Sequence, residues 1–224
     1  MDDLLIDNID EQRHWNLEDS WIDSGKEWNH ILGMDHMWEE YIGPMIQPYA
    51  KGKALEIACG FGRMTQEVLD RCGGVESLYV VDLNKTCIEK CVQRFGSSVS
   101  GYFVNDGKTL KAIPDNYVDF IFSYDSFVHM HFNVVISYIG EIQRVLKPGG
   151  ICSLHLSSLE DGEDLSFPNP GGRARFNIDQ FQQTMNDLDL RIIEKTLIKA
   201  NHYSSVDDYF IVIEKNNFKN IFEI

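Results

Sequence analysis

Residues 53–65 read Lys-Ala-Leu-Glu-Ile-Ala-Cys-Gly-Phe-Gly-Arg-Met-Thr, and this stretch decides the fold. Its apolar first half predicts a buried strand, the glycines at 60 and 62 predict a tight turn, and the segment from Arg63 onward is typical of a helix. Glycine adopts positive φ without strain and lets a ligand approach the backbone, and the N–H groups at a helix start can donate to that ligand. The stretch therefore predicts a strand, turn and helix that cradle a nucleotide-like cofactor.

Strand-like and helix-like segments alternate along the chain after this turn. We expect helices over 64–71, 85–95 and 132–146, and strands over 77–82, 101–105, 117–123 and 151–157. Their short connections favour a parallel sheet with helices on both faces. After the last of these strands come a loop rich in Gly and Pro, a helix over 178–188, and two strand-like runs over 190–200 and 206–214. The two runs are separated by a short turn and should pair as an antiparallel hairpin.

The N-terminal part differs from this alternating pattern. Residues 1–26 are polar and acidic, which predicts a loosely ordered arm. Apolar residues at three- and four-residue spacings over 27–41 predict an amphipathic helix that ends before Pro44 and Pro48. We therefore divide the chain into an arm with a substrate-capping helix, 1–48, and one α/β domain, 49–224, in which the loop near 158–176 could act as a lid.

Composition excludes several classes of protein. Lys and Arg number 20 against 35 Asp and Glu, so the formal net charge of -15 disfavours nucleic acids and anionic membrane surfaces as partners. No run approaches the ~20 apolar residues of a membrane span, and the acidic N-terminus differs from a signal peptide. The five cysteines include no Cys-x-x-Cys pair and are expected to be reduced thiols. We expect a soluble, cytoplasmic protein.

Asp82 ends the second predicted strand, about twenty residues beyond the glycine turn. An acid at this place can accept hydrogen bonds from both ribose hydroxyls of a bound nucleotide. NAD and S-adenosylmethionine both fit such a site. A turn that binds NAD should carry glycine or alanine where this chain has Thr65, and nothing else in the sequence requires a pyrophosphate, so the pattern favours S-adenosylmethionine.

Over roughly residues 50–215 the chain resembles class I S-adenosylmethionine-dependent methyltransferases. Five motifs in order carry the resemblance: the glycine turn, Val80-Val-Asp82, Asn105-Asp-Gly107, Val118-Asp-Phe-Ile-Phe-Ser123 and Arg144-Val-Leu-Lys-Pro-Gly-Gly150. The resemblance implies a Rossmann-like, doubly wound, seven-stranded α/β sheet, mostly parallel with an antiparallel last strand. It also implies that residues 49–224 are the methyltransferase domain and that the cofactor is S-adenosyl-L-methionine.

The resemblance further implies which residues hold the cofactor. Glu56 would orient the turn and the amino group of the cofactor, and the two glycines of the turn would let the methionine part pass close to the backbone. Asp82 would hold the ribose and Asp106 would lie at the adenine. The complete expected set is Glu56, Gly60, Gly62, Arg63, Asp82, Leu83, Asn105, Asp106, Gly107, Ser123 and Tyr124.

Methyl transfer to an oxygen or a nitrogen requires positioning and the removal of a proton. His129 follows the strand predicted over 117–123, at the sheet edge where open α/β sheets bind ligands, and is our first candidate for the general base. Residues 123–130 also resemble the matching piece of phosphoethanolamine methyltransferases, in which a histidine deprotonates the substrate. Asp125 could orient the imidazole or contact the substrate, and His131 is the alternative base.

The same three residues could also be considered as metal ligands. Two imidazoles and one carboxylate suit a transition metal better than magnesium, which prefers oxygen ligands. We expect no metal in this protein.

Residues outside the motifs are the candidates for binding the methyl acceptor. We expect contacts from the N-terminal helix and from the loop after 158, namely Trp28, Trp38, Tyr41, Arg173 and Arg175. The two arginines could clamp a phosphate or a carboxylate. The motifs are also similar to those of bacterial methyltransferases of sugars, polysaccharides and secondary metabolites, although His155 stands where a doubled histidine is expected.

That similarity implies transfer to a hydroxyl of a small molecule. Two alternatives stay open. The acidic composition would suit N-methylation of a small cationic amine, and a protein with this turn could also bind the cofactor without catalysis. The sequence does not indicate an oligomeric state.

Overall fold

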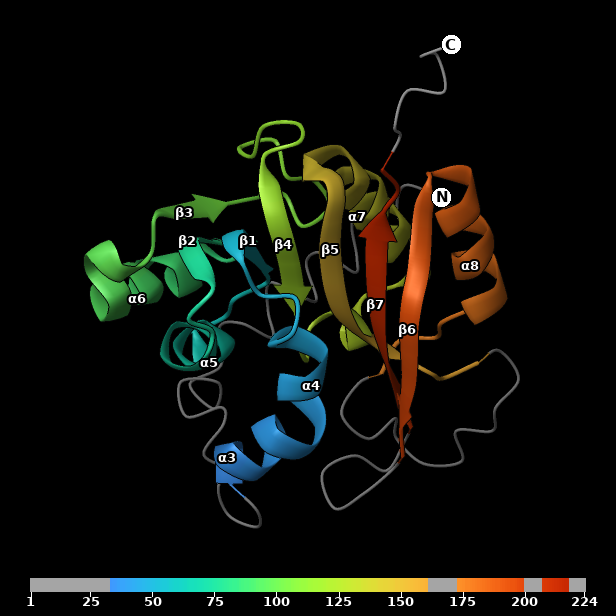
Figure 1. Ribbon diagram of the computed structural model, residues 1–224, viewed down its shortest axis with the longest axis horizontal. Coiled ribbons are helices and arrows are strands. Elements are labelled where there is room, and N and C mark those ends of the chain that lie inside the picture. The colour runs from blue at the N-terminus through green and yellow to red at the C-terminus, as the bar shows by residue number, and fades with distance from the viewer. Residues whose placement is uncertain (1–32, 161–172, 200–206, 218–224) are drawn as a thin grey trace.

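The computed structural model describes residues 33–160, 173–199 and 207–217, and in this part of the chain seven strands form one sheet (Figure 1). The strands are β1 (Gly52–Ile57), β2 (Val75–Asp82), β3 (Gly101–Val104), β4 (Val118–Ser123), β5 (Leu146–Ser157), β6 (Leu190–Ile198) and β7 (Asp208–Lys215). Their order across the sheet is β3-β2-β1-β4-β5-β7-β6. The predicted Rossmann-like, seven-stranded architecture is confirmed.

The directions of the strands determine which edge of the sheet is suited to bind a ligand. Strand β1 pairs in parallel with β2 and with β4, β2 pairs in parallel with β3, and β4 pairs in parallel with β5. Strand β7 runs antiparallel to both β5 and β6, which confirms the predicted hairpin. Because the chain order reverses between β1 and β4, the carboxyl ends of these two strands and of β2 flank the switch point where open α/β sheets bind ligands.

Helices cover both faces of the sheet. They are α5 (Arg63–Arg71), α6 (Lys85–Phe95), α7 (Phe132–Val145) and α8 (Ile178–Asp187), with short 3-10 turns η3 (Gly96–Ser98) and η4 (Phe127–His129). Helices α7 and α8 contribute to one buried cluster, and α5 and α6 contribute to the other. The side chains of Asn84 and Asn177 cap α6 and α8 by accepting backbone N–H groups. None of the described helices is long and apolar enough to span a membrane.

The N-terminal helical segment does not end before Pro44, and that prediction is wrong. The described part consists of α3 (Gly33–Met37), the π-helical turn η2 (Trp38–Ile42) and α4 (Gly43–Ile46). Pro44 lies in the first turn of α4, where its missing N–H removes no helical hydrogen bond. The Gly43 N–H instead donates to the Trp38 carbonyl, so the wider π turn carries the helix past the proline.

This helical segment packs against the sheet rather than standing apart from it. Trp38, Ile42 and Ile46 are at most 3% exposed and belong to the same buried cluster as α5 and α6. The hydroxyl of Ser153 on β5 donates to the Met45 carbonyl over 2.7 Å, which joins α4 to the middle of the sheet. The boundary at residue 48 and the capping role of the segment stay predictions, and residues 1–32 lie outside the described part of the chain.

Strand β5 begins at Leu146 and not at Ile151 as predicted. The glycines and proline of residues 147–150 end α7, but they continue as extended chain beside β4. The ammonium of Lys147 lies 2.7 Å from the Asp119 carboxylate, and Gly149 takes a φ of 75° that favours glycine. These contacts keep the segment against the sheet and explain why a turn signal does not form a loop here.

Replacement of Phe181 by alanine should test whether α8 is held by its buried face. Phe181 is fully buried against the cluster beneath α7, so Phe181→Ala should lower the free energy of unfolding by about 3–5 kcal/mol. Leu197→Ala, at a side chain that is 38% exposed, should lower it far less. Urea unfolding of both variants gives the two values, and equal losses would contradict the packing described for α8.

Candidate functional site

The turn after β1 has the backbone shape that its glycines predict. Gly60 and Gly62 have φ values of 53° and 81°, and Ala58 also lies in the left-handed region at 58°. A Cβ on Gly62 would lie 2.3 Å from the Phe95 ring, so only glycine fits between this turn and α6. A Cβ on Gly60 would meet no atom within 4 Å, so the backbone of Gly60 is open on that side. The turn is therefore tight against α6 and accessible at Gly60.

Asp82 holds this turn from the end of β2. Its carboxylate accepts the N–H groups of Gly60 and Asn84, each over 2.8 Å, and the residue is 3% exposed. Burial raises the pKa of Asp82 to about 6, although the two backbone hydrogen bonds act in the opposite direction. A carboxylate has about four acceptor positions, so two remain for other donors such as hydroxyls.

Glu56 lies at the base of the same turn, in the carboxyl-terminal half of β1. The carboxyl group is buried and accepts the Thr65 hydroxyl over 2.5 Å. Burial raises the pKa of Glu56 to about 8, which keeps the group largely protonated at neutral pH. Thr65, which the sequence offered only as evidence against NAD, thus has a partner of its own: it fixes the side chain of Glu56.

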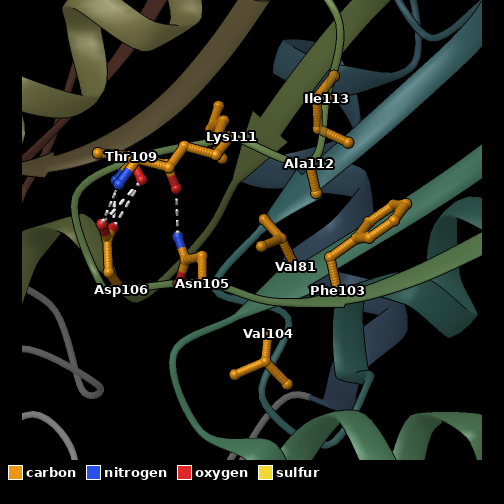
Figure 2. Close-up of a pocket in the computed structure, with 10 residues that line it drawn as sticks. Val81, Phe103, Val104, Asn105, Asp106, Thr109, Lys111, Ala112 and Ile113 are labelled. Carbon is orange, nitrogen blue, oxygen red and sulfur yellow. Dashed lines mark hydrogen bonds and ion pairs between the residues drawn. The ribbon is translucent and has the colours of Figure 1, made fainter.

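A cavity of about 370 Å³ opens beside β2 and β3 (Figure 2). Its lining residues come from the ends of these strands and from the loop that follows β3: Val81, Phe103, Val104, Asn105, Asp106, Thr109, Leu110, Lys111, Ala112 and Ile113. Most of these side chains are apolar, and Asn105 and Asp106 supply polar groups at one end. The cavity has the size and mixed lining of a small-molecule site.

The carboxylate of Asp106 is engaged by its own loop. It accepts the Thr109 N–H over 2.7 Å, the Thr109 hydroxyl over 2.9 Å and the Lys108 N–H over 3.1 Å. Burial alone would raise the pKa of Asp106, but these donors and the nearby ammonium of Lys111 hold it below its ordinary value. Asp106 therefore shapes the cavity wall, and Gly107, whose N–H donates to Asn105 Oδ1, completes the turn.

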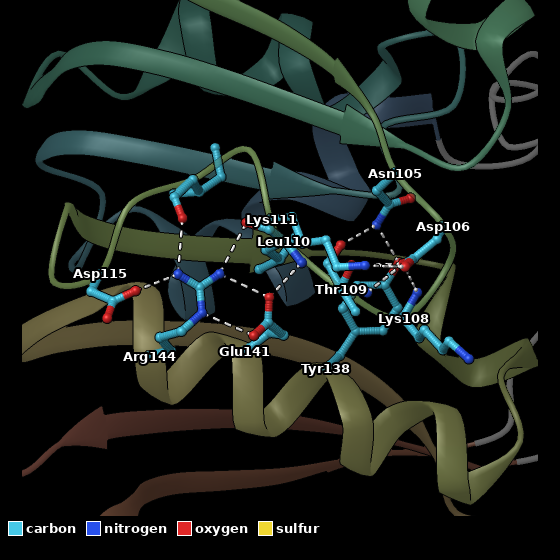
Figure 3. A network of polar contacts seen from close by, with 11 residues as sticks. Asn105, Asp106, Lys108, Thr109, Leu110, Lys111, Asp115, Tyr138, Glu141 and Arg144 are labelled. Atoms are coloured by element: carbon cyan, nitrogen blue, oxygen red, sulfur yellow. Dashed lines mark hydrogen bonds and ion pairs between the residues drawn. The ribbon is translucent and has the colours of Figure 1, made fainter.

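Three residues of α7 fix this loop, a role that the sequence did not indicate (Figure 3). The Asn105 amide donates to Tyr138 Oη over 2.7 Å, and Glu141 Oε2 accepts the Leu110 N–H over 2.6 Å. The Arg144 guanidinium donates to the carbonyls of Leu110 and Ile113, each over 3.0 Å, and also pairs with Glu141. The three residues are spaced three positions apart, which places them on one face of the helix, and this spacing is the sequence signal that could have identified them.

The carboxyl end of β4 joins the turn to the residues after the strand. The Ser123 hydroxyl donates to the Ile57 carbonyl over 2.7 Å, and the Tyr124 ring stacks on the His155 ring with centroids 4.6 Å apart. Asp125 follows with a φ of 58°, and its Oδ2 lies 3.0 Å from the guanidinium of Arg63, the first residue of α5. Asp125 thereby connects β4 directly to the glycine turn.

The structure separates the two candidate bases. His129 ends η4 and is half-buried, whereas His131 is exposed and stands at the start of α7. Burial alone would raise the pKa of Asp125, but Arg63, His129, His155 and Arg173 hold it below its ordinary value. His129 therefore lies within electrostatic range of an ionised carboxylate.

The residues expected at the methyl acceptor lie in different surroundings. Trp28 lies outside the described residues, and Trp38 is 3% exposed, with the Arg71 guanidinium 5.6 Å from its ring centre. Tyr41 is half-buried. Trp38 is thus a core residue of the face covered by α5.

The two predicted arginines also differ from each other. Arg173 is buried, donates to both carboxylate oxygens of Asp208 over 2.9–3.2 Å, and lies 3.8 Å from Asp125. Arg175 is exposed and donates to the Glu160 carbonyl over 2.6 Å. Arg173 therefore belongs to a buried charge cluster that the sequence did not reveal.

The remaining predicted residues occupy unremarkable positions. Leu83 is half-buried between Asp82 and Asn84. Across the described ranges 33–160, 173–199 and 207–217, no three His, Cys, Asp or Glu side chains lie in a group that could hold a metal ion. The five cysteines are all buried free thiols.

Comparison with known proteins identifies a protein family and several solved structures that are similar to this chain. Residues 55–154 match the family model described as a methyltransferase domain. No curated protein matches the sequence significantly. Among solved structures, a Haloferax volcanii complex that contains the Trm112 methyltransferase activator matches at 16% identity with a TM-score of 0.65, covering 89% of this chain and 97% of that chain.

Two further structures match at the same identity. A SAM-dependent methyltransferase from Methanosarcina mazei has 16% identity and a TM-score of 0.60, covering 80% of this chain and 98% of that chain. The [4+2]-cyclase SpnF also has 16% identity and a TM-score of 0.60, covering 82% and 79%. Because a cyclase shares the fold, the fold alone does not fix the reaction.

The family match spans the glycine turn, β2, β4 and most of β5. The chain carries a methyltransferase domain in the class I fold. It is an enzyme, and its cofactor is S-adenosyl-L-methionine.

The raised pKa of Glu56 predicts a pH dependence of stability. Its pKa is about 8 in the folded chain and near 4.5 when unfolded, so the folded state binds the extra proton and loses stability as pH rises through this interval. In the unmodified chain the free energy of unfolding should fall by up to about 1.4 kcal/mol per pH unit between pH 6 and 8. Glu56→Gln, which keeps an acceptor for Thr65 but cannot ionise, should abolish this fall. Urea unfolding at both pH values checks the difference, and identical slopes would contradict the buried neutral carboxyl.

Removal of the Asp82 carboxylate should weaken cofactor binding. Asp82→Ala deletes the acceptor for the Gly60 N–H and the remaining acceptor positions, and a charged hydrogen bond is worth about 1.5–3 kcal/mol. The dissociation constant of S-adenosylhomocysteine should rise roughly tenfold to a hundredfold in calorimetry. Asp70→Ala, at an exposed residue of the adjoining α5, is the control, and equal affinity in both variants would exclude this role for Asp82.

Proposed function

We propose that this methyltransferase transfers a methyl group to a hydroxyl of a small molecule, a sugar or a secondary metabolite, with His129 as general base. The observation that carries the proposal is the Asp125 carboxylate, which lies 3.0 Å from Arg63 beside the glycine turn and whose pKa Arg63 and His129 hold below its ordinary value. S-adenosylmethionine supplies a methyl group on a sulfonium. The acceptor oxygen must lose its proton as it is methylated, and an imidazole with an ordinary pKa of about 6.5 suits this task at neutral pH.

The geometry of the turn supports binding of the cofactor at the proposed residues. The open side of Gly60 leaves room for a ligand at the backbone, and Asp82 keeps two acceptor positions for the ribose hydroxyls. The cavity beside β2 and β3 offers apolar walls for an adenine, with the backbone of residues 105–107 at its polar end. These three features lie in order from β1 to β3.

Asp125 would serve the base in two ways. Its negative charge stabilises the imidazolium that forms when His129 takes the proton, and it limits the orientations of the ring. Arg63 holds the Asp125 carboxylate at 3.0 Å, so the base is tied to the first residue after the cofactor turn. This connection would keep the proton acceptor on the side of the site where the methyl group arrives.

The charges around the proposed base favour a neutral acceptor. Arg63 pairs with Asp125, and Arg173 pairs with Asp208, so the two arginines and two carboxylates sum to no net charge. This arrangement does not support a phosphate or carboxylate clamp at Arg173. A hydroxylated molecule without a formal charge fits the cluster best.

A small amine is the second candidate acceptor. The net charge of -15 attracts cations, and a protonated amine also needs a base before it can accept a methyl group. A screen that compares hydroxylated and amine acceptors, read through the release of S-adenosylhomocysteine, would separate the two. The buried free thiols also support the expectation that the enzyme works in the reducing cytoplasm.

Replacement of His129 should abolish most of the turnover. His129→Gln keeps a polar side chain of similar size but cannot take the proton, so kcat for an acceptor found in the screen should fall roughly 10²- to 10⁴-fold. Binding of S-adenosylhomocysteine should persist, because the glycine turn and Asp82, and not His129, are proposed to hold the cofactor.

The matched control is His131→Gln, at the exposed histidine two residues further on. Its kcat should stay close to that of the unmodified enzyme. A large loss in His131→Gln with full activity in His129→Gln would reverse the assignment of the base.

A further inference from the structure

His155 lies on β5, and neither the cofactor site nor the proposed base uses it. The side chain is 3% exposed and its ring lies almost parallel to the Tyr124 ring, at an interplanar angle of 13°. The Phe210 ring of β7 is the third member of this stack, with its centroid 6.0 Å from that of His155. A buried imidazole needs partners for both ring nitrogens.

Both nitrogens of His155 face groups of the buried charge cluster. Nδ1 accepts the backbone N–H of Asp125 over 3.2 Å, and Nε2 lies 3.4 Å from the Asp208 carboxylate. A nitrogen that accepts an N–H carries no proton, so the ring proton belongs to Nε2, which points at Asp208. Asp208 thus fixes the tautomer in which Nδ1 is free to accept.

Asp125 needs such support because of its backbone conformation. A φ of 58° is uncommon for a residue with a side chain, and such conformations persist where the surroundings enforce them. The hydrogen bond from its N–H to His155 acts on the backbone itself. In this conformation the carboxylate reaches Arg63 at 3.0 Å and comes within 3.8 Å of Arg173.

We infer that His155 is a positioning residue, whose Nδ1 holds the Asp125 backbone in the left-handed conformation that turns its carboxylate toward Arg63 and His129. Asp208 acts one step further away by holding the imidazole tautomer. The inference rests on the proposed function, because the pair that His155 positions is the proposed acid–base pair. The sequence indicated His155 only as a departure from an expected motif. The inference assigns it a structural role, because it joins β5 to the residue that follows β4.

The groups that face Asp125 define what a test must measure. They are Arg63 of α5, His129 of η4, His155 of β5 and Arg173, with Tyr124 next to it in the chain and Asp208 of β7 behind the imidazole. The cations hold the pKa of Asp125 below its ordinary value only while the carboxylate points at them. The titration of the Asp125 carboxyl therefore reports its orientation.

The experiment is a carbon-13 NMR titration of the full chain, without ligand, with the Asp125 carboxyl resonance assigned through Asp125→Asn. In His155→Phe the ring stack stays and the acceptor is lost, so the pKa of Asp125 should rise by roughly one pH unit or more. In His155→Gln an amide oxygen can accept the same N–H, and the pKa should stay low. A crystal structure of His155→Phe should find Asp125 with negative φ.

Ser153→Ala is the matched control. It removes another buried hydrogen bond, from the Ser153 hydroxyl to the Met45 carbonyl, two residues away on the same strand. The pKa of Asp125 should not change. If His155→Phe does not fold, His155→Met replaces it, since a thioether fills the space and is only a weak acceptor.

Three outcomes would overturn the inference. They are an unchanged Asp125 pKa in His155→Phe, an equal rise in His155→Phe and His155→Gln, and an equal rise in Ser153→Ala. The titration needs no acceptor, so it is independent of the proposed base. Full turnover in His129→Gln would remove the proposed base, while a raised Asp125 pKa in His155→Phe would still establish the positioning contact.

Discussion

The two hydrogen bonds that the Asp82 carboxylate accepts from Gly60 and Asn84 are the constraint on which the site depends. They join the end of β2 to the turn after β1 and to the start of α6, so three elements meet at one buried side chain. A buried carboxylate is stable only with such donors, and burial still raises the pKa of Asp82 to about 6. The shape of the cofactor turn is thus held by hydrogen bonds within the chain, from backbone N–H groups to one buried side chain.

The neighbouring wall of the site is held in a different way. The loop after β3 has little regular structure, and its backbone groups are satisfied by side chains of α7, chiefly Glu141 and Arg144. Because these contacts engage the carbonyls and N–H groups of the loop, the side chains of the loop can line the cavity. The helix and the cavity should therefore respond together to a change in either.

The sequence predicted the elements well because each has a local signal. The apolar runs, the glycine turn and the asparagine caps of α6 and α8 all report on neighbours within a few residues. The predicted end of the N-terminal helix was wrong for the same reason: a proline is a local stop signal, but the π turn before Pro44 and the packing of Ile42 and Ile46 on the sheet override it. The electrostatic effect of His129 on Asp125 likewise acts between residues only four positions apart in the chain.

By itself, the sequence determined the class of fold, the place of the glycine turn and the acid that faces it, because alternating strands and helices permit few topologies. Only the tertiary structure decided which charges meet. Arg173 pairs with Asp208, 35 positions further along the chain, and His155 accepts the N–H of Asp125, 30 positions before it. Periodicity shows which face of an element is buried, but a pairing across β4, β5 and β7 depends on strand order and register, which exist only once the sheet has formed.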